Sequence, residues 1–321
     1  QDPTGGIYAA PGTPEEHAKF GVQHGDEVEV LGRTDAGGFA PIVTGVESNR
    51  PVTVRRIGPG RMPRALRVSP DLTSFAMFDN NWVEAAGVVR SVVHLEEVWE
   101  DDRIQMVLDA GNGRFRVVLP GFPKGTPMPG SLVDSVVRME GVFSSVANER
   151  RQLVGVRLLV PGLDHIHVET AAPLDPFALP AVSMADLNKY RPSAAPSRRV
   201  RVQGVVVAVR RGRGIYVQEG ELGLWVERSG PETAKVGDRV SAVAFPGLGP
   251  VNPRLEDAEL RVEGQAPLPA PLVLSGTNWI NGNLEGRRVA VEGEVMAQGV
   301  HAEGRILTLR TEPHPGALAS A

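Results

Sequence analysis

The chain has 321 residues, of which 41% are hydrophobic and 22% charged, so its composition is that of a globular protein and excludes a disordered one. Its formal net charge of -4 argues against the basic surface that many nucleic-acid-binding proteins carry, although it allows a local basic patch. The absence of cysteine excludes disulfides, thiol nucleophiles and cysteine zinc sites, and no apolar run is long enough to span a membrane.

Three glycine-rich segments predict β-hairpins, because in each an acidic residue and a turn precede a strand with an aromatic residue. They are residues 1–8, 108–115 and 218–225. The second and third follow an alternating strand that runs into a glycine, but for the first that strand would lie before Gln1. We therefore expect the chain to begin inside a domain.

The strand that runs into a glycine occurs three times, at residues 83–88, 200–205 and 289–294, with glycines at 87, 204 and 293. Apolar residues alternate with others in each copy, which is typical of a half-buried strand. Repetition at this scale predicts an array of small β units in place of one large domain. A glycine in the first strand also allows the strand to curl, so that it can belong to both sheets of a small barrel.

Two further strands complete each unit. An alternating strand recurs at residues 25–30, 135–140 and 237–242, and a closing strand led by proline or glutamine recurs at 41–46, 152–157 and 253–258. About five strands then fall in roughly 70 to 90 residues, which predicts an OB-like five-stranded barrel. The predicted fold class is all-β, with tandem OB-like barrel repeats.

Short proline-rich segments with a helical turn, such as residues 71–78 and 183–187, are expected to link the units, with Ser or Asp as the N-cap. The last copy is too short to close a barrel, so we expect the chain to end inside a domain as well. The predicted parts are 1–66 (C-terminal part of a truncated repeat), 67–81 (linker), 82–172 (repeat), 173–196 (linker), 197–266 (repeat), 267–285 (linker) and 286–321 (N-terminal part of a truncated repeat).

Residues 148–161, followed by residues 175–180, resemble the N-terminal sensory region of a group of large bacterial sensor histidine kinases. Residues 2–41 and 199–226 are similar to the repeats of that region. The resemblance implies a periplasmic, extracytoplasmic module that precedes a membrane anchor and a kinase, with a small molecule or protein as its ligand and a homodimer formed through the kinase. The chain has no kinase motif, so no catalytic or binding residue is carried over.

The strongest local signal for binding is a group of arginines in the third unit. The turn after its first strand would bring them to the rim of the ligand face of an OB-like barrel, near two aromatic residues. Such a site would suit a phosphate, a carboxylate or single-stranded nucleic acid. The other interpretation is a solvated turn in a chain that has only four lysines and uses arginine as its ordinary cation. The candidate residues are Arg210, Arg211, Arg213, Tyr216 and Trp225.

The matching turn of the second unit is acidic, with five carboxylates between Glu96 and Asp102 around Trp99. It is interpreted as a solvated hairpin tip, although it could also dock against the basic turn. His165 and His167 alternate on one face of a predicted strand, beside Asp164, and could hold a metal, but a third ligand is missing. We therefore expect no catalytic site, no metal site and no cofactor.

The leading hypothesis is a non-catalytic sensory module that binds a ligand or partner and relays binding through the geometry between repeats. The alternative is a nucleic-acid-binding OB array that uses the arginine-rich third repeat. Oligonucleotide binding that weakens steeply with salt would favour the alternative, and absence of binding at low salt would remove it.

Overall fold

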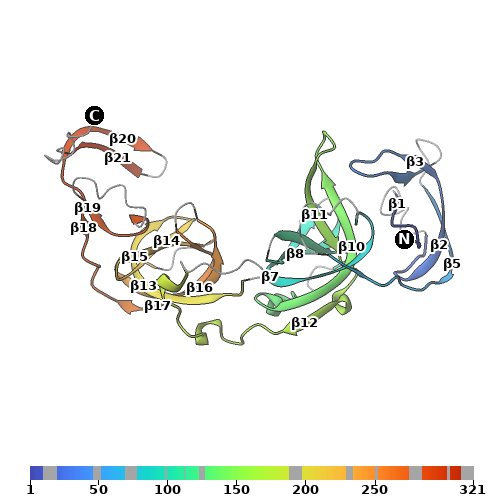
Figure 1. Cartoon of the computed structure of the whole chain (residues 1–321), viewed down its shortest axis with the longest axis horizontal. Helices are drawn as coiled ribbons and strands as arrows, with labels where there is room; N and C mark the ends of the chain where they lie inside the picture. The colour runs from blue at the N-terminus through green and yellow to red at the C-terminus, as the bar shows by residue number, and fades with distance from the viewer. Residues whose placement is uncertain are drawn as a thin grey trace, which may run out of the picture. The chain divides into compact units, whose positions relative to one another are not determined.

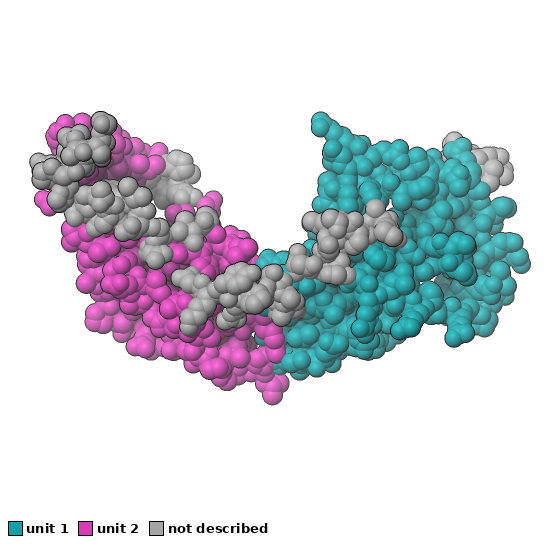
Figure 2. Space-filling model, in the orientation of Figure 1, with its two compact units in different colours: residues 1–172, 192–197 teal, residues 173–191, 198–321 magenta. Residues whose placement is uncertain are grey.

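The computed structural model describes residues 1–321 except 10–19, 46–51, 69–77, 98–99, 112, 123–126, 188–196, 229–233, 250–251, 275–283, 302–303 and 312–321. The described residues form an all-β structure, as predicted, in two compact units (Figures 1 and 2). Unit 1 holds residues 1–172 and 192–197, and unit 2 holds residues 173–191 and 198–321. None of the described helices has the length and apolar character needed to cross a lipid bilayer.

Unit 1 contains twelve strands and unit 2 contains nine among the described residues, counted from the ranges that follow. Those of unit 1 are β1 (Tyr8–Ala9), β2 (Asp26–Leu31), β3 (Arg33–Asp35), β4 (Ile42–Thr44), β5 (Thr53–Pro59), β6 (Leu66–Arg67), β7 (Trp82–Glu97), β8 (Glu100–Asp109), β9 (Arg114–Leu119), β10 (Val136–Ala147), β11 (Leu153–Leu159) and β12 (Ile166–Thr170). Those of unit 2 are β13 (Val200–Arg210), β14 (Gly214–Glu219), β15 (Leu222–Glu227), β16 (Asp238–Gly247), β17 (Arg254–Gln265), β18 (Leu272–Val273), β19 (Val289–Ala290), β20 (Glu294–His301) and β21 (Gly304–Arg310).

Strands β13 to β17 form a closed barrel in the order β13-β14-β15-β17-β16. All neighbouring pairs are antiparallel except β15 and β17, which run parallel. Five strands in this order, with the third parallel to the fifth, make an OB-like barrel. The fold class that the repeats predict is confirmed.

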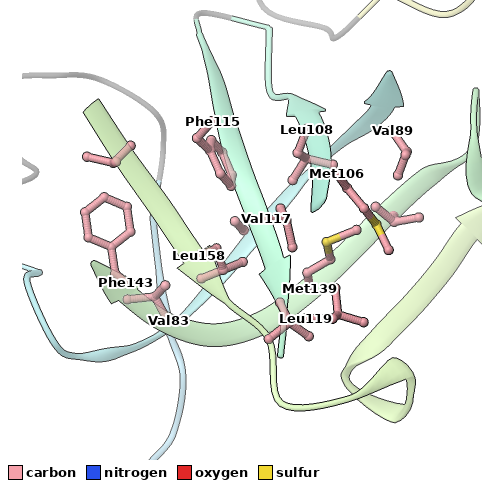
Figure 3. Packing of buried hydrophobic residues seen from close by; sticks show 14 of the residues in the cluster. Val83, Val89, Met106, Leu108, Phe115, Val117, Leu119, Met139, Phe143 and Leu158 are labelled. Atoms are coloured by element: carbon pink, nitrogen blue, oxygen red, sulfur yellow. The ribbon is translucent and has the colours of Figure 1, made fainter. Parts of the chain in front are cut away.

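Strands β7 to β11 repeat this arrangement in unit 1. They follow the order β7-β8-β9-β11-β10, β9 and β11 are parallel, and pairing of β10 with β7 closes the ring. Two short strands extend the sheet: β6 pairs with β7, and β12 pairs with β10. The core contains the inward residues of all five barrel strands, among them Val83, Met106, Val117, Met139 and Leu158 (Figure 3).

The recurring glycine has a steric role in both barrels. A Cβ atom on Gly87 would lie 2.4 Å from the carbonyl oxygen of Asp109, and one on Gly204 would lie 2.7 Å from that of Gln218. Neither glycine has a positive φ, so the requirement is close approach of two backbones. A register shift follows two residues later in each first strand, and such bulges bend a strand and increase its twist. The shifts lie between Val89 and Ser91, between Val206 and Ala208, and, after Gly293, between Val295 and Ala297.

Residues 183–187 form the helical turn that the sequence predicted, as α2 (Met184–Leu187). Ser183 is its N-cap, because its Oγ accepts a hydrogen bond of 3.3 Å from the amide of Asp186. Met184 is fully buried in the core of the β13–β17 barrel, and its amide donates to Glu219 Oε2 at 3.0 Å. This segment, expected to be a linker, therefore supplies a core residue to the barrel. The other predicted linker helix, at residues 71–78, lies almost entirely outside the described residues.

The short motif at residues 175–180 packs against β17. Asp175 caps the 3-10 turn η4 (Pro176–Ala178) by accepting a hydrogen bond of 2.9 Å from the amide of Phe177. The guanidinium carbon of Arg261 lies 4.1 Å from the centroid of the Phe177 ring. These contacts give the motif a structural role in unit 2.

Both ends of the chain contain parts of the same strand pattern. Strand β1 is parallel to β4, as the third and fifth strands are in the barrels, and β3 is antiparallel to β4. Strands β20 and β21 form a hairpin with the same bulge as the first two barrel strands. The predicted boundaries of the repeats and linkers remain predictions.

Candidate ligand-binding face

Tyr216 and Trp225 lie side by side on the outer face of the β13–β17 barrel. They are register partners on β14 and β15, and their ring centroids are 4.9 Å apart with a tilt of 54°. Both point outward, because Ile215, Leu224 and Val226 beside them belong to the core. Each ring is half-buried, so part of its surface is open to a ligand. OB folds bind their ligands on the face of these second and third strands.

Arginines lie at one rim of this face. Arg210, the last residue of β13, places its guanidinium carbon 5.8 Å from the centroid of the Tyr216 ring, within the range of a cation–π contact. Arg211 and Arg213 follow in the turn, and all three side chains are exposed. The amide of Arg213 donates to the carbonyl of Arg210 at 3.0 Å, which closes the turn. The structure thus brings the five predicted residues together, and their role in binding stays a prediction.

Two glycines allow the turn to approach the aromatic pair. Gly212 has a φ of +69°, a left-handed conformation that favours glycine. Gly214 has a φ of +149°, and a Cβ on it would lie 2.2 Å from the carbonyl oxygen of Val226 and 3.0 Å from the Trp225 ring. A side chain at position 214 would therefore push against the tryptophan.

Sequence reasoning missed Arg254, which lies next to Trp225 as its register partner on β17. Its Nη2 is 2.8 Å from Glu256 Oε1, and its Nη1 is 3.9 Å from Glu227 Oε2. The face therefore carries carboxylates as well as arginines, and its positive charge is concentrated on the turn. Alternation along β17, where Leu255 is buried, is the signal that could have placed Arg254 on the outside.

A later segment, residues 284–288, covers the other end of the same face. The amide of Arg288 donates to Gln218 Oε1 at 2.9 Å. The backbone of Gly286 lies so close to Gly223 that a Cβ atom added to Gly223 would be 2.1 Å from the carbonyl group of Gly286. The open part of the face is consequently the end that holds the two rings and the arginine turn.

The predicted neighbours His165 and His167 are separated in the structure. His165 ends the 3-10 turn η3 (Leu163–His165), because its amide bonds to the carbonyl of Gly162 at 3.2 Å, so the expectation that both histidines lie on one strand is wrong. His167 lies on β12 opposite Arg138. Among the described residues, no group of three or more His, Asp or Glu side chains is placed to hold a metal ion.

Most of the acidic turn of the first barrel lies outside the described residues. Glu97 and Glu100 are register partners at the end of the β7–β8 ladder. The side chains from Glu96 to Asp102 lie outside the described residues, and so does Trp99. The predicted contact between acidic and basic turns stays a prediction.

A cluster of three rings that the sequence did not predict joins the N-terminal part to the first barrel. The ring of His24 lies 5.1 Å from that of Trp82 and 4.9 Å from that of His165, measured between centroids. Burial lowers the pKa of His24 below its ordinary value of 6.5, and the neighbouring His165 lowers it further, while Asp164 acts in the opposite direction. Protonation of His24 is therefore disfavoured in the folded state.

We expect unit 1 to lose stability as the pH falls below about 6.5, because the unfolded chain then binds a proton at His24 more readily than the folded chain does. The His24→Gln variant should show a smaller drop in melting temperature between pH 7.5 and 5.5 than the parent protein. His167→Gln, an exposed histidine of the same unit, is the matched control. Equal drops in the parent and in His24→Gln would contradict this prediction.

No protein-family model and no curated protein matches the chain. Similar solved structures include the Ifi202 HINa domain in complex with 20-bp dsDNA, at 9% identity over 56% of this chain and 96% of that one, with a TM-score of 0.22. A murine DNA-binding protein bound to dsDNA has 10% identity over 57% of this chain and 99% of that one, with a TM-score of 0.25. A replication protein A heterotrimer bound to ssDNA has 10% identity over 79% of this chain and 83% of that one, with a TM-score of 0.21. Such low values carry no argument about function, and the OB-like assignment rests on the strand order and registers of the two barrels.

Proposed function

We propose that this chain is a non-catalytic binding module whose β13–β17 barrel binds single-stranded nucleic acid. The observation that carries the proposal is the Tyr216–Trp225 pair, which lies on the ligand face of the barrel with the Arg210 guanidinium beside it. Every base has a π-face that can stack on such rings, while arginines follow the phosphates. The sequence alone favoured a sensory module, and the geometry of this face supports the alternative better.

The charge distribution fits this function despite the net charge of -4. Arg210, Arg211 and Arg213 are exposed at one rim, and Arg254 lies on the other side of Trp225. Since Arg254 is ion-paired with Glu256 and Glu227, a strand of nucleic acid that crosses the rings would meet its phosphate contacts mainly at the arginine turn. Recognition would be largely independent of sequence, because stacking and phosphate contacts do not distinguish the bases.

A salt titration tests the proposal. We expect a single-stranded oligonucleotide to bind at low salt and to lose affinity steeply as salt is added. Replacing Arg210, Arg211 and Arg213 together with Ser should reduce the slope of log affinity against log salt by about 2, since each lost phosphate contact removes about 0.7. The measurement is fluorescence anisotropy of a labelled oligonucleotide between 20 and 200 mM salt.

The control variant replaces Arg33, Arg61 and Arg64, three exposed arginines of the N-terminal part, with Ser. It changes the net charge by the same amount and should leave the slope nearly unchanged. The proposal fails if the parent protein does not bind at low salt, or if both triple variants show the same slope.

A second proposal is the sensory role, and with it the extracytoplasmic location, that the resemblance to sensor histidine kinases implies. The observation that favours it is the segment 284–288, which lies on the same face as Tyr216 and Trp225. A ligand on the rings would lie beside this segment and could alter how it is held. In the same titration, hydrogen exchange at the Arg288 amide should change on saturation, and an unchanged rate would exclude this route of signalling.

A further inference from the structure

Two arginines lie side by side on the outer face of the other barrel. Arg116 in β9 and Arg157 in β11 are register partners in the parallel pairing of these strands. Both point away from the core, because Phe115, Val117 and Leu158 beside them are packed inside it (Figure 3). Arg116 is exposed and Arg157 half-buried, so two guanidinium groups share one patch of the surface.

Among the described residues, no carboxylate pairs with this positive charge. Like charges on directly neighbouring positions of a sheet repel and destabilise it. In the part of the chain that the structure describes, no carboxylate oxygen lies within 4.0 Å of either guanidinium. Arg157 Nε donates to Ser144 Oγ at 3.3 Å, and a hydroxyl does not neutralise its charge.

Other arginines of the same barrel are paired with acids. Arg138 Nη1 lies 2.9 Å from Glu84 Oε2, and this contact holds the pKa of Glu84 below its usual range. Arg114 and Arg90 share Asp109, with N–O distances of 3.2 and 3.5 Å. Arg116 and Arg157 therefore differ from Arg138, Arg114 and Arg90, each of which lies within 4.0 Å of a carboxylate.

The registers of the two barrels show that this patch is equivalent to the face that carries Tyr216 and Trp225. Val88, directly after Gly87, pairs with Asp109, just as Val205, directly after Gly204, pairs with Gln218. From these pairs, the strand registers can be followed across each sheet, and they align the outward residues of one barrel with those of the other. The equivalent positions are Val107 and Tyr216, Arg116 and Trp225, and Arg157 and Arg254. One barrel thus carries two rings where the other carries valine and arginine.

We propose that Arg116 and Arg157 form a second anion site, which binds a phosphate group carried by a nucleic-acid backbone or by an inorganic polyphosphate chain. Guanidinium groups bind phosphate oxygens through charge-assisted hydrogen bonds, and a phosphate between the two would remove their repulsion. Valine at position 107 replaces the ring of Tyr216, so the described residues of this face offer a base no ring to stack on and favour recognition of charge. It requires no contribution from Trp225 and does not depend on the function proposed for the other barrel.

The test uses the full chain with Arg116 and Arg157 both replaced by Gln. Isothermal titration at low salt with inorganic polyphosphate, and separately with an abasic single-stranded oligonucleotide, should show at least a tenfold loss of affinity. The slope of log affinity against log salt for the abasic strand should fall by about 1.4, as expected for two lost contacts. The melting temperature should not fall, because the substitution removes a repulsion.

Arg61→Gln with Arg64→Gln is the matched control, since it removes the same charge from exposed positions of the same unit. Equal affinities of this control and of the Arg116/Arg157 variant for both probes would overturn the proposal. A loss for both probes supports a site for phosphate of either source, and a loss for one probe alone supports the site and identifies that probe as the source. The single variant Trp225→Ala should retain polyphosphate binding. If this single substitution abolishes polyphosphate binding, the second site is refuted, while the function proposed for the other barrel stands.

Discussion

Replacing Gly87 with alanine should lower the stability of the first barrel by about 2–3 kcal/mol, at the upper end of the usual cost of overpacking. A Cβ at this position would lie 2.4 Å from the carbonyl oxygen and 2.9 Å from the carbonyl carbon of Asp109. Both are backbone atoms of the neighbouring strand β8, so they cannot rotate away as a side chain could. For a domain of this size the melting temperature should fall by about 10 °C.

Gly155→Ala is the matched control for this experiment. Gly155 lies on β11 of the same barrel, and a Cβ on it would meet no atom within 4 Å. This substitution should be neutral or stabilise the barrel by up to about 1 kcal/mol, because alanine reduces the entropy of the unfolded chain. Calorimetry of the three proteins gives the comparison, and equal melting temperatures for the two variants would refute the steric role of Gly87.

Replacing Trp225 with alanine should weaken oligonucleotide binding by about 1–3 kcal/mol, or roughly 5- to 150-fold, which is the usual contribution of one stacked base. The ring lies on the outer face, packed against Tyr216 at 4.9 Å between centroids, and contributes nothing to the core cluster. The loss should therefore appear in affinity and not in folding. The slope against salt should stay the same, because no phosphate contact is removed.

Tyr8→Ala controls for loss of an exposed aromatic residue, since Tyr8 is 52% exposed in the N-terminal part of the chain. It should bind like the parent protein. An abasic strand of the same length adds a second comparison, because it offers phosphates without bases and should bind the parent and Trp225→Ala equally. The stacking role is refuted if Trp225→Ala binds the normal oligonucleotide as tightly as Tyr8→Ala does.

The two proposed sites make the barrels complementary in chemistry. The first barrel has arginines at the positions where the second has Trp225 and Arg254, and valine at the position of Tyr216. One face would hold a phosphate and the other would stack a base. The shared registers allow this difference because the outward positions contribute little to either core, so they can change while the barrel stays closed.

Much of this architecture was predictable from local patterns along the chain. Alternating strands, glycine turns and the recurring glycines at 87 and 204 led to an OB-like barrel, because strand periodicity and close backbone approach leave direct marks on the sequence. The N-cap Ser183 was recognised for the same reason, since its hydrogen bond to the amide of Asp186 is local. The arginine turn was also found, because its members are adjacent in the chain.

Only the tertiary structure decided which distant residues meet. Strand order and register placed Arg254 beside Trp225, paired Arg116 with Arg157, and brought His24 against His165. Burial of Met184 in a barrel that follows it along the chain was equally invisible in its own segment. Such contacts depend on how strands far apart in sequence align, and a shift of one residue would turn each side chain to the opposite face.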